Sequence, residues 1–410
     1  MRQIKILLIM VVVTLSLLAS AAMPGNAAAE TVDQLRQQAE QGDAKVQALL
    51  GYMYSTGQDV PQDYQEAAKW TRKAAEQGNA RGQSNLGSMY GMGQGVPQDY
   101  QEAIRWYRLA AEQGDADAQF NLGVMYNQGM GVSQDNREAM KWYHLAASQG
   151  FVQAQALLGA MYDLGQGVPQ DYHEAAKWYR KAAEQGEAKA QALLGAMYYQ
   201  GQGMPQDYQE AAKWTRQAAE RGEVKAQSNL GVMYEKGQGV PQDYHEAAKW
   251  YRKAAAQGYT AAEVNLGNMY YNGQGVSQDY KEAIRWYRLA AEQGDADAQF
   301  NLGTMYDDGQ GVPQDYHEAV KWYRKAAEQG HAFAQSCLGD MYFGGKGVSQ
   351  DDVEGYAWII IGSSNGLDES RQKIVEVQKQ ALQQMMTPSQ IAAAQRRAKE
   401  IQAGLGHQRQ

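Results

Sequence analysis

A period of 36 residues runs through most of this chain and limits what it can fold into. Glycines recur at this interval from Gly42 to Gly366, and all nine tryptophans, from Trp70 to Trp358, keep the same interval. No insertion or deletion breaks the register. A regular period of this length is typical of stacked supersecondary units, each of which contacts only its neighbours. The sequence therefore predicts one long array rather than two or three ordinary domains.

One unit of the array, residues 79–114, predicts two helices. Leu86, Met89 and Tyr90 recur at helical spacing and place a first helix there, and Ala103, Trp106 and Ala110 do the same for a second. Glycines end both helices, because they tolerate the left-handed conformation of a helix C-terminus. The predicted fold is an all-α solenoid of nine 36-residue helix-turn-helix repeats over residues 43–366. A capping helix is expected at 30–42, and capping helices at 367–410.

The glycine-rich sequence GQGVPQDY at 93–100 recurs, with small changes, nine times. A glycine loop can hold a phosphate, but phosphate loops follow a strand and carry a Lys that is missing here. The interpretation as a turn between two helices is therefore preferred. Asp99 is predicted to cap the second helix, and Glu102 to reach back to the cap as in a capping box. The equivalent aspartates are Asp63, Asp135, Asp171, Asp207, Asp243, Asp279, Asp315 and Asp351.

The first 29 residues have the pattern of a secretory signal. Arg2 and Lys5 precede an apolar run from Ile6 to Ala22, and small residues at 27–29 form an A-x-A site. The alternative is an uncleaved anchor, because the apolar run reaches the lower length limit of a spanning helix. The A-x-A site favours cleavage after Ala29. The predicted location is the periplasm or the exterior, with no membrane insertion after cleavage.

Charge and residue content exclude several classes of function. The net charge is −8 and no run of Lys or Arg occurs, so nucleic acid is not an expected partner. The single cysteine, Cys337, permits no intramolecular disulfide and is predicted to be a small core residue. His173, His245 and His317 share one repeat position but lie two repeats apart, too far to share a metal ion. No metal or cofactor is predicted.

The fixed positions of the repeat resemble those of a known family. The pattern A-x(5)-L-G-x-M-Y-x-x-G-x-G-V-x-x-D-x-x-x-A-x-x-W-Y-x-x-A-A-x-x-G is similar to the SLR (Sel-one-like) repeat of the tetratricopeptide superfamily. The sequence EGYA before Trp358 and the sequence MTPSQIAAAQRRAKE resemble the closing segment of secreted bacterial members. The resemblance implies an α-solenoid that binds other proteins as a scaffold or adaptor, often in the bacterial cell envelope.

A second function, that of an envelope enzyme, also follows from the resemblance. A cysteine-rich subset of the family is associated with penicillin binding or β-lactamase activity, and this chain departs from it with its single cysteine. The sequence Ser370-Arg-Gln-Lys373 matches the S-x-x-K motif of penicillin-recognising enzymes, but the S-D-N and K-T-G motifs are absent from the sequence. A chance match is preferred, and no catalytic residue is predicted. The alternative function is a peptidoglycan-related or penicillin-binding protein.

Candidate binding residues come from comparing the nine copies with one another. Relative to the Gly of each Leu-Gly pair, positions −3, +1, +4 and +5 vary widely, and their spacing puts them on one face of the first helix. That helix lines the concave surface of two-helix solenoids, so this face is predicted to contact an extended partner such as a peptide or an envelope component. Tyr199 and Tyr271 are expected to be exposed there. The candidates are Tyr52, Phe120, Asn127, Tyr199, Glu235, Lys236, Asn268, Tyr271, Phe300, Asp307 and Asp308.

Two blocks of the array are nearly identical. Residues 100–123 and 280–303 differ only at Gln101 and Lys281. Their separation is five repeats, which indicates a block duplication. An array that gains repeats in this way is expected of a scaffold more than of an enzyme with one site.

Overall fold

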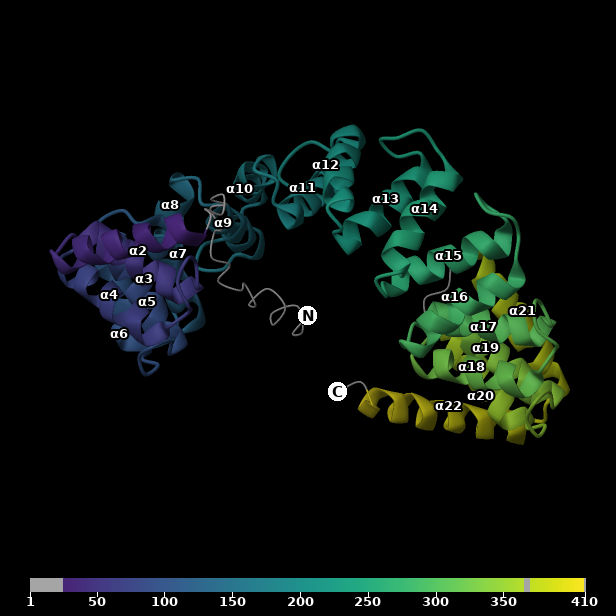
Figure 1. The fold of residues 1–410 in the computed structure, drawn as a ribbon. Helices are drawn as coiled ribbons and strands as arrows, with labels where there is room; N and C mark the ends of the chain where they lie inside the picture. Colours follow the sequence, from purple (N-terminus) through teal and green to yellow (C-terminus); the bar gives the residue numbers. More distant parts are fainter. Residues whose placement is uncertain (1–24, 365–368, 409–410) are drawn as a thin grey trace. The chain divides into compact units, whose positions relative to one another are not determined.

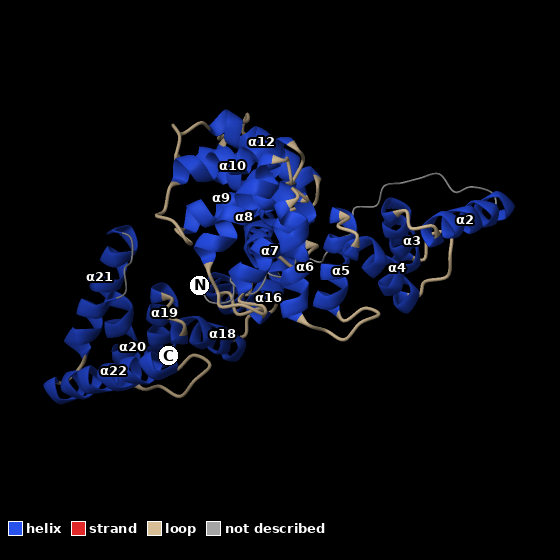
Figure 2. Cartoon of the chain, turned by 90° about the vertical axis from the view of Figure 1, so that its left-hand side faces the viewer, coloured by secondary structure: helices blue, strands red, loops and turns tan. Residues whose placement is uncertain are grey.

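The computed structural model describes residues 25–364 and 369–408, and within these ranges the chain is all-α (Figures 1 and 2). The predicted signal at 1–29 lies largely outside the described residues. The helices are α2 Gly25–Glu40, α3 Ala44–Thr56, α4 Tyr64–Glu76, α5 Ala80–Met92, α6 Tyr100–Glu112, α7 Ala116–Gln128, α8 Asn136–Ser148, α9 Val152–Leu164, α10 Tyr172–Glu184, α11 Ala188–Gln200, α12 Tyr208–Glu220, α13 Val224–Lys236, α14 Tyr244–Ala255, α15 Thr260–Asn272, α16 Tyr280–Glu292, α17 Ala296–Asp308, α18 Tyr316–Glu328, α19 Ala332–Gly344, α20 Asp352–Ser364, α21 Glu369–Met385 and α22 Pro388–Gln408.

The repeats form an α-solenoid, as predicted, and within each of the two units below, consecutive helices of the repeats pack together. The odd-numbered helices α3 to α19 are the first helices of the nine repeats, and the even-numbered α4 to α20 are the second helices. The chain divides into two compact units, one ending at residue 170 and the other beginning at 171. The first unit contains α2 to α9, and the second contains α10 to α22.

The glycine predicted to end a first helix and the aspartate predicted to cap a second helix both have these roles in the structure. In repeat two, Gly93 ends α5 with φ +69°, and its N–H donates to the carbonyl of Met89. The Asp99 carboxylate accepts hydrogen bonds from the N–H groups of Gln101 and Glu102, at 2.9 and 3.1 Å. The hydrogen bonds at Gly93 and Asp99 pair backbone groups that a helix end would otherwise leave without a partner. GQGVPQDY is thus a turn between helices.

The predicted capping box is wrong in its second half. The N–H of Asp99 donates to the carbonyl of Tyr90 in the preceding helix, at 2.9 Å, so it does not need the Glu102 carboxylate. The glutamate side chain at this position points along its own helix instead. Glu66 accepts from the indole Nε1 of Trp70 at 3.1 Å and pairs with Lys69 at 2.9 Å.

In eight of the repeats, the glycine of the Leu-Gly pair allows the two helices to approach closely. In repeat two, a Cβ on Gly87 would lie 2.8 Å from the ring of Tyr107 in α6. Leu86 is fully buried and packs with Trp106 and with Ala75 of the repeat before. The tryptophan therefore fills the space between consecutive repeats, while the glycine accepts the tyrosine within one repeat.

The second glycine of the loop fixes each repeat to the one before it. Gly239 has φ +74°, and a Cβ placed there would lie 1.7 Å from the carbonyl oxygen of Tyr208, at the start of α12. In the first repeat, which follows α2 instead of a complete repeat, the equivalent position is Asp59 at φ +58°. The glycine is thus required where the loop lies on a preceding second helix.

Hydrogen bonds between side chains also link consecutive repeats. In seven of the nine second helices an arginine donates to the tyrosine hydroxyl of the Met-Tyr pair 18 residues later, for example Arg108 to Tyr126 at 2.7 Å. The same bond occurs in both units, at Arg72–Tyr90, Arg180–Tyr198, Arg216–Tyr234, Arg252–Tyr270, Arg288–Tyr306 and Arg324–Tyr342.

A buried glutamine forms a ladder of hydrogen bonds along the repeats. Its amide nitrogen donates to a carbonyl of the preceding helix, as Gln227 does to Ala219 at 3.1 Å, and its oxygen accepts from the glutamine that ends the second helix, as from Gln257 at 2.8 Å. The seventh repeat has Glu263 at this position, only 3% exposed. Its carboxylate accepts from Gln293 at 2.8 Å.

We expect Glu263→Gln to stabilise the protein by about 1 kcal/mol at neutral pH, because the amide would donate to the carbonyl of Ala255 and remove a buried charge. Burial raises the pKa of Glu263. The folded state therefore binds this proton more tightly than the unfolded state, and the cost of Glu263 appears only as pH rises above the unfolded value of about 4.3. Urea unfolding of the wild type and of Glu263→Gln should show a gain in stability at pH 7 and a smaller gain at pH 4. An equal gain in stability at pH 7 and pH 4 would show that the charge of Glu263 does not destabilise the protein.

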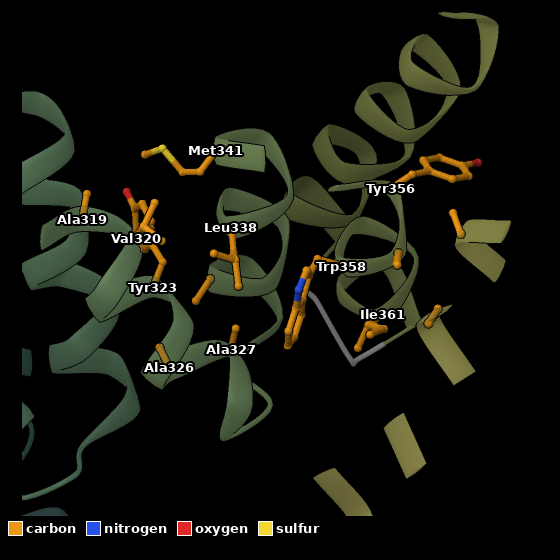
Figure 3. Packing of buried hydrophobic residues seen from close by; sticks show 14 of the residues in the cluster. Ala319, Val320, Tyr323, Ala326, Ala327, Leu338, Met341, Tyr356, Trp358 and Ile361 are labelled. Atoms are coloured by element: carbon orange, nitrogen blue, oxygen red, sulfur yellow. The ribbon is translucent and has the colours of Figure 1, made fainter. Parts of the chain in front are cut away.

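The last repeat is closed by α22 instead of another repeat. Ala394 and Ala398 of α22 are buried in the same cluster as Tyr356 and Trp358 of α20. Leu338 of α19 lies between Trp358 and the α18 residues of this cluster (Figure 3). Helix α22 thus covers α20 as a following first helix would. At the other end of the array, α2 packs on α3.

Candidate functional site

The four variable positions of the first helix differ in how far they are exposed. Position −3 lies inside the array and is not a binding surface in most repeats. Phe120 is only 7% exposed, and its ring stacks on Phe151 of the next repeat with centroids 4.9 Å apart. Phe300 is half-buried and stacks in the same way on His331, at 4.7 Å. The prediction that Phe120 offers a binding surface is therefore wrong, because the next repeat covers it.

Positions +1 and +4 provide partners for the buried tyrosines of the second helices. The hydroxyl of Tyr251, whose side chain is fully buried, donates to Glu235 at 2.6 Å, and that of Tyr287 donates to Asn268 at 2.7 Å. Tyr323 lies 3.3 Å from Asp307 in the same arrangement. A buried hydroxyl without a partner is costly. Glu235, Asn268 and Asp307 therefore contribute to the framework, although their residue types vary between copies.

The pKa values of these groups follow from the same burial. Burial raises the pKa of Tyr107 to about 12, against the opposing effect of its hydrogen bond with Ser88. Burial also raises the pKa of Tyr251, and the Glu235 carboxylate adds to this effect. The pKa of Asp307 is raised by burial as well. None of these tyrosines is activated as a base, since each holds its proton more firmly than a free tyrosine.

The tyrosines at +4 are half-buried rather than exposed, contrary to the prediction. The hydroxyl of Tyr199 donates to Gln238 of the next repeat at 2.6 Å, and its ring meets Tyr208 edge-on with centroids 5.1 Å apart. Tyr271 meets Tyr280 in the same way at 5.4 Å. In the third repeat Asn127 donates to Asn136 at 3.0 Å. These side chains link the end of the first helix to the start of the second. Tyr52 is also half-buried.

Position +5 is the surface of the first helices. We call its residues the exposed row, and most of them have at least a third of their area in solvent. Lys236 and Asp308, both predicted, belong to it. The prediction missed two apolar members, Met92 at 46% and Leu164 at 62% exposed. Their variation between copies was visible in the sequence, but their exposure was not. The row is Thr56, Met92, Gln128, Leu164, Gln200, Lys236, Asn272, Asp308 and Gly344.

In the last repeat, α21 contacts the variable face of α19 through the side chain of Gln378. Gln378 of α21 accepts from the hydroxyl of Ser336, at position −3, over 2.7 Å. Gln378 also bonds to Asp340 at position +1, which opposes the rise in the pKa of Asp340 caused by burial. Helix α21 thus reaches across α19 at the positions predicted to bind a partner.

The described residues bring together no metal-binding cluster of His, Cys, Asp and Glu. His173, His245 and His317 are exposed. Cys337 is half-buried, and burial raises the pKa of its thiol. The side chain of Ser370 lies outside the described residues. Among the described helices, none has both the length and the apolar character needed to cross a bilayer.

Comparison with known proteins identifies the repeat. The model of the Sel1 repeat matches nine consecutive segments, at residues 44–79, 80–115, 116–151, 152–187, 188–223, 224–259, 260–295, 296–331 and 332–367. A protective antigen present in uropathogenic Escherichia coli strains, which displays an SLR fold, is 34% identical with a TM-score of 0.53, over 90% of this chain and 94% of that one. A Sel1 repeat protein from Oxalobacter formigenes is 33% identical with a TM-score of 0.56, over 92% and 99%. No curated protein matches the sequence.

Proposed function

Because the chain belongs to the Sel1 repeat family, whose members are generally protein-interaction scaffolds, we propose that it is a non-catalytic scaffold of the bacterial cell envelope. It binds an extended segment of a partner protein along the first helices of its repeats. The contacts with the partner come from the exposed row, most of whose residues are exposed to solvent at the ends of these helices.

The observation that carries this choice of face is the position of α21. This helix bonds to Ser336 and Asp340 of α19 through Gln378, so the variable face of one repeat already holds a segment of polypeptide. The other eight repeats present the same positions on their first helices. Positions −3, +1 and +5 are four residues apart and lie on one face of the first helix, so a partner segment that lies across those helices would reach the exposed row.

The residues of the exposed row suit a partner of mixed character. Met92 and Leu164 offer apolar area, while Lys236 and Asp308 offer opposite charges. A row that changes from repeat to repeat gives each repeat its own preference, and the sum over an array gives specificity for one extended partner.

Export is the second part of the proposal. The basic, apolar and A-x-A pattern of residues 1–29 supports it. The relative from uropathogenic E. coli, at 34% identity, is described as a protective antigen. Intact-mass measurement of the protein from its native host should give a chain that begins at Glu30, and a retained Met1 would exclude cleavage.

Charge reversal in the exposed row tests the scaffold. The variant Lys236→Glu/Asp308→Lys keeps the net charge, and with residues 30–410 as bait we expect it to capture the partner from envelope extract about tenfold less well than the wild type. The matched control is Lys399→Glu/Glu328→Lys, which exchanges two exposed charges on α22 and α18. Equal capture by the two variants would show that the partner binds elsewhere.

A further inference from the structure

A pocket on the second helix α16 belongs neither to the exposed row nor to the framework. Its volume is about 360 Å³, and it is lined by one face of α16 and by the loop that follows α17. Ile284 forms a buried floor, and Leu289 lies beside it with 39% of its area exposed. Gly311 and Val312 of the loop close the end near the start of α16, since a Cβ on Gly311 would lie 2.7 Å from Tyr280.

Three cations and one carboxylate surround this apolar floor. Lys281 lies at the closed end, Arg285 and Arg288 follow along the helix, and Glu292 lies at the far end. Arg285 forms an ion pair with Glu282 at 3.2 Å, and Arg288 donates a hydrogen bond to the hydroxyl of Tyr306 at 2.7 Å. Within the described part of the chain, the side chain of Lys281 has no ion pair or hydrogen bond. A net-acidic protein thus presents an unpaired cation beside exposed apolar area.

We propose that this pocket binds the carboxyl terminus of a partner protein whose last residue is apolar. A terminal residue carries its side chain and its carboxylate on one carbon, so both fit a pocket where apolar floor and cations lie side by side. The chain end is placed at Lys281, where Gly311 and Val312 of the loop border the pocket.

The duplicated block supplies an internal control for the pocket. Residues 100–123 repeat residues 280–303 with one difference, Gln101 in place of Lys281. The other seven lining residues have identical counterparts, including the loop residues Gly131 and Val132. The counterpart of Leu289, Leu109, is 38% exposed. The first unit therefore carries the same surface without the lysine.

The test uses fluorescence polarisation with a labelled pentapeptide, Gly-Ser-Gly-Ala-Leu, and residues 30–410. We expect the free acid to bind and the C-terminal amide not to bind. Lys281→Gln should weaken binding about threefold, as the loss of one exposed charge pair does. Leu289→Lys should weaken it about tenfold through the loss of apolar contact, and lysine already occupies this position at Lys73, Lys181, Lys253 and Lys325 without harm to the repeat. Gln101→Lys should strengthen binding to the matching surface of the first unit about threefold, so that the two surfaces bind the peptide equally well.

Four results would overturn the proposal. Equal affinity for acid and amide, or no binding of either, would exclude recognition of a chain end. Tighter binding by Leu289→Lys would show attraction to positive charge alone. Wild-type affinity of Lys281→Gln would show that the lysine has no role. The variant Lys236→Glu/Asp308→Lys should bind this peptide normally, so failure of the pocket and failure of the exposed row are separable.

Discussion

Gly239→Ala should lower the free energy of unfolding by about 3 kcal/mol or more, the largest effect we expect from a single methyl group in this protein. Gly239 has a left-handed backbone, which costs an alanine about 1–2 kcal/mol. The added Cβ would also lie 1.7 Å from the Tyr208 carbonyl oxygen, so the loop must move away from α12. Urea unfolding of the wild type and the variant measures the difference.

The control for this change lies two residues earlier in the same loop. Gly237 is also left-handed, at φ +66°, but a Cβ there would meet only Gln242, at 3.3 Å. Gly237→Ala should therefore cost only the backbone strain of about 1–2 kcal/mol. Equal costs at the two glycines would mean that the loop does not rest on the preceding repeat.

Gly87→Ala should destabilise the protein by about 2 kcal/mol, although glycine to alanine inside a helix usually stabilises. The new Cβ would lie 2.8 Å from the ring of Tyr107, which is 6% exposed and has no free space to move into. Gly91 is one helical turn further along α5, and a Cβ there would meet only Ala103, at 3.9 Å.

Gly91→Ala should therefore stabilise by up to about 1 kcal/mol, so the two substitutions should have opposite signs within one helix. Thermal or urea unfolding of the two variants gives the comparison. A stabilised Gly87→Ala would show that α5 and α6 do not approach as closely as the Leu-Gly pair implies.

Local signals made the architecture predictable from the sequence. The 36-residue period, the glycines at helix ends and the aspartate caps each depend on residues a few positions apart, and the structure has Gly93 and Asp99 in the predicted roles. Glu102 was predicted to complete a capping box and does not, because the N–H of Asp99 is already bonded to Tyr90 across the loop. A contact between two helices of one repeat overrides the local motif there.

The candidate site was less predictable, because variation between copies has two causes. Lys236 and Asp308 vary at an exposed position, as predicted for a binding surface. Glu235 and Asn268 vary because different acceptors can satisfy the same buried tyrosine hydroxyl. The tyrosine lies 16 or 19 residues away on the other helix, so the pairing is not visible in the pattern of one helix. The position of Phe120 varies between copies, and so does the position of Phe151 in the next repeat, on which Phe120 stacks.

Site-specific photocrosslinking tests most directly the central claim, that the exposed row of the first helices holds the partner. A photoreactive residue is placed at Lys236 or Asp308 in the exposed row, and at Glu328 or Lys399 as exposed controls on other helices. Irradiation of the native host should give a crosslinked protein from the first two positions and little from the controls. Crosslinks from the control positions with none from Lys236 and Asp308 would contradict the account.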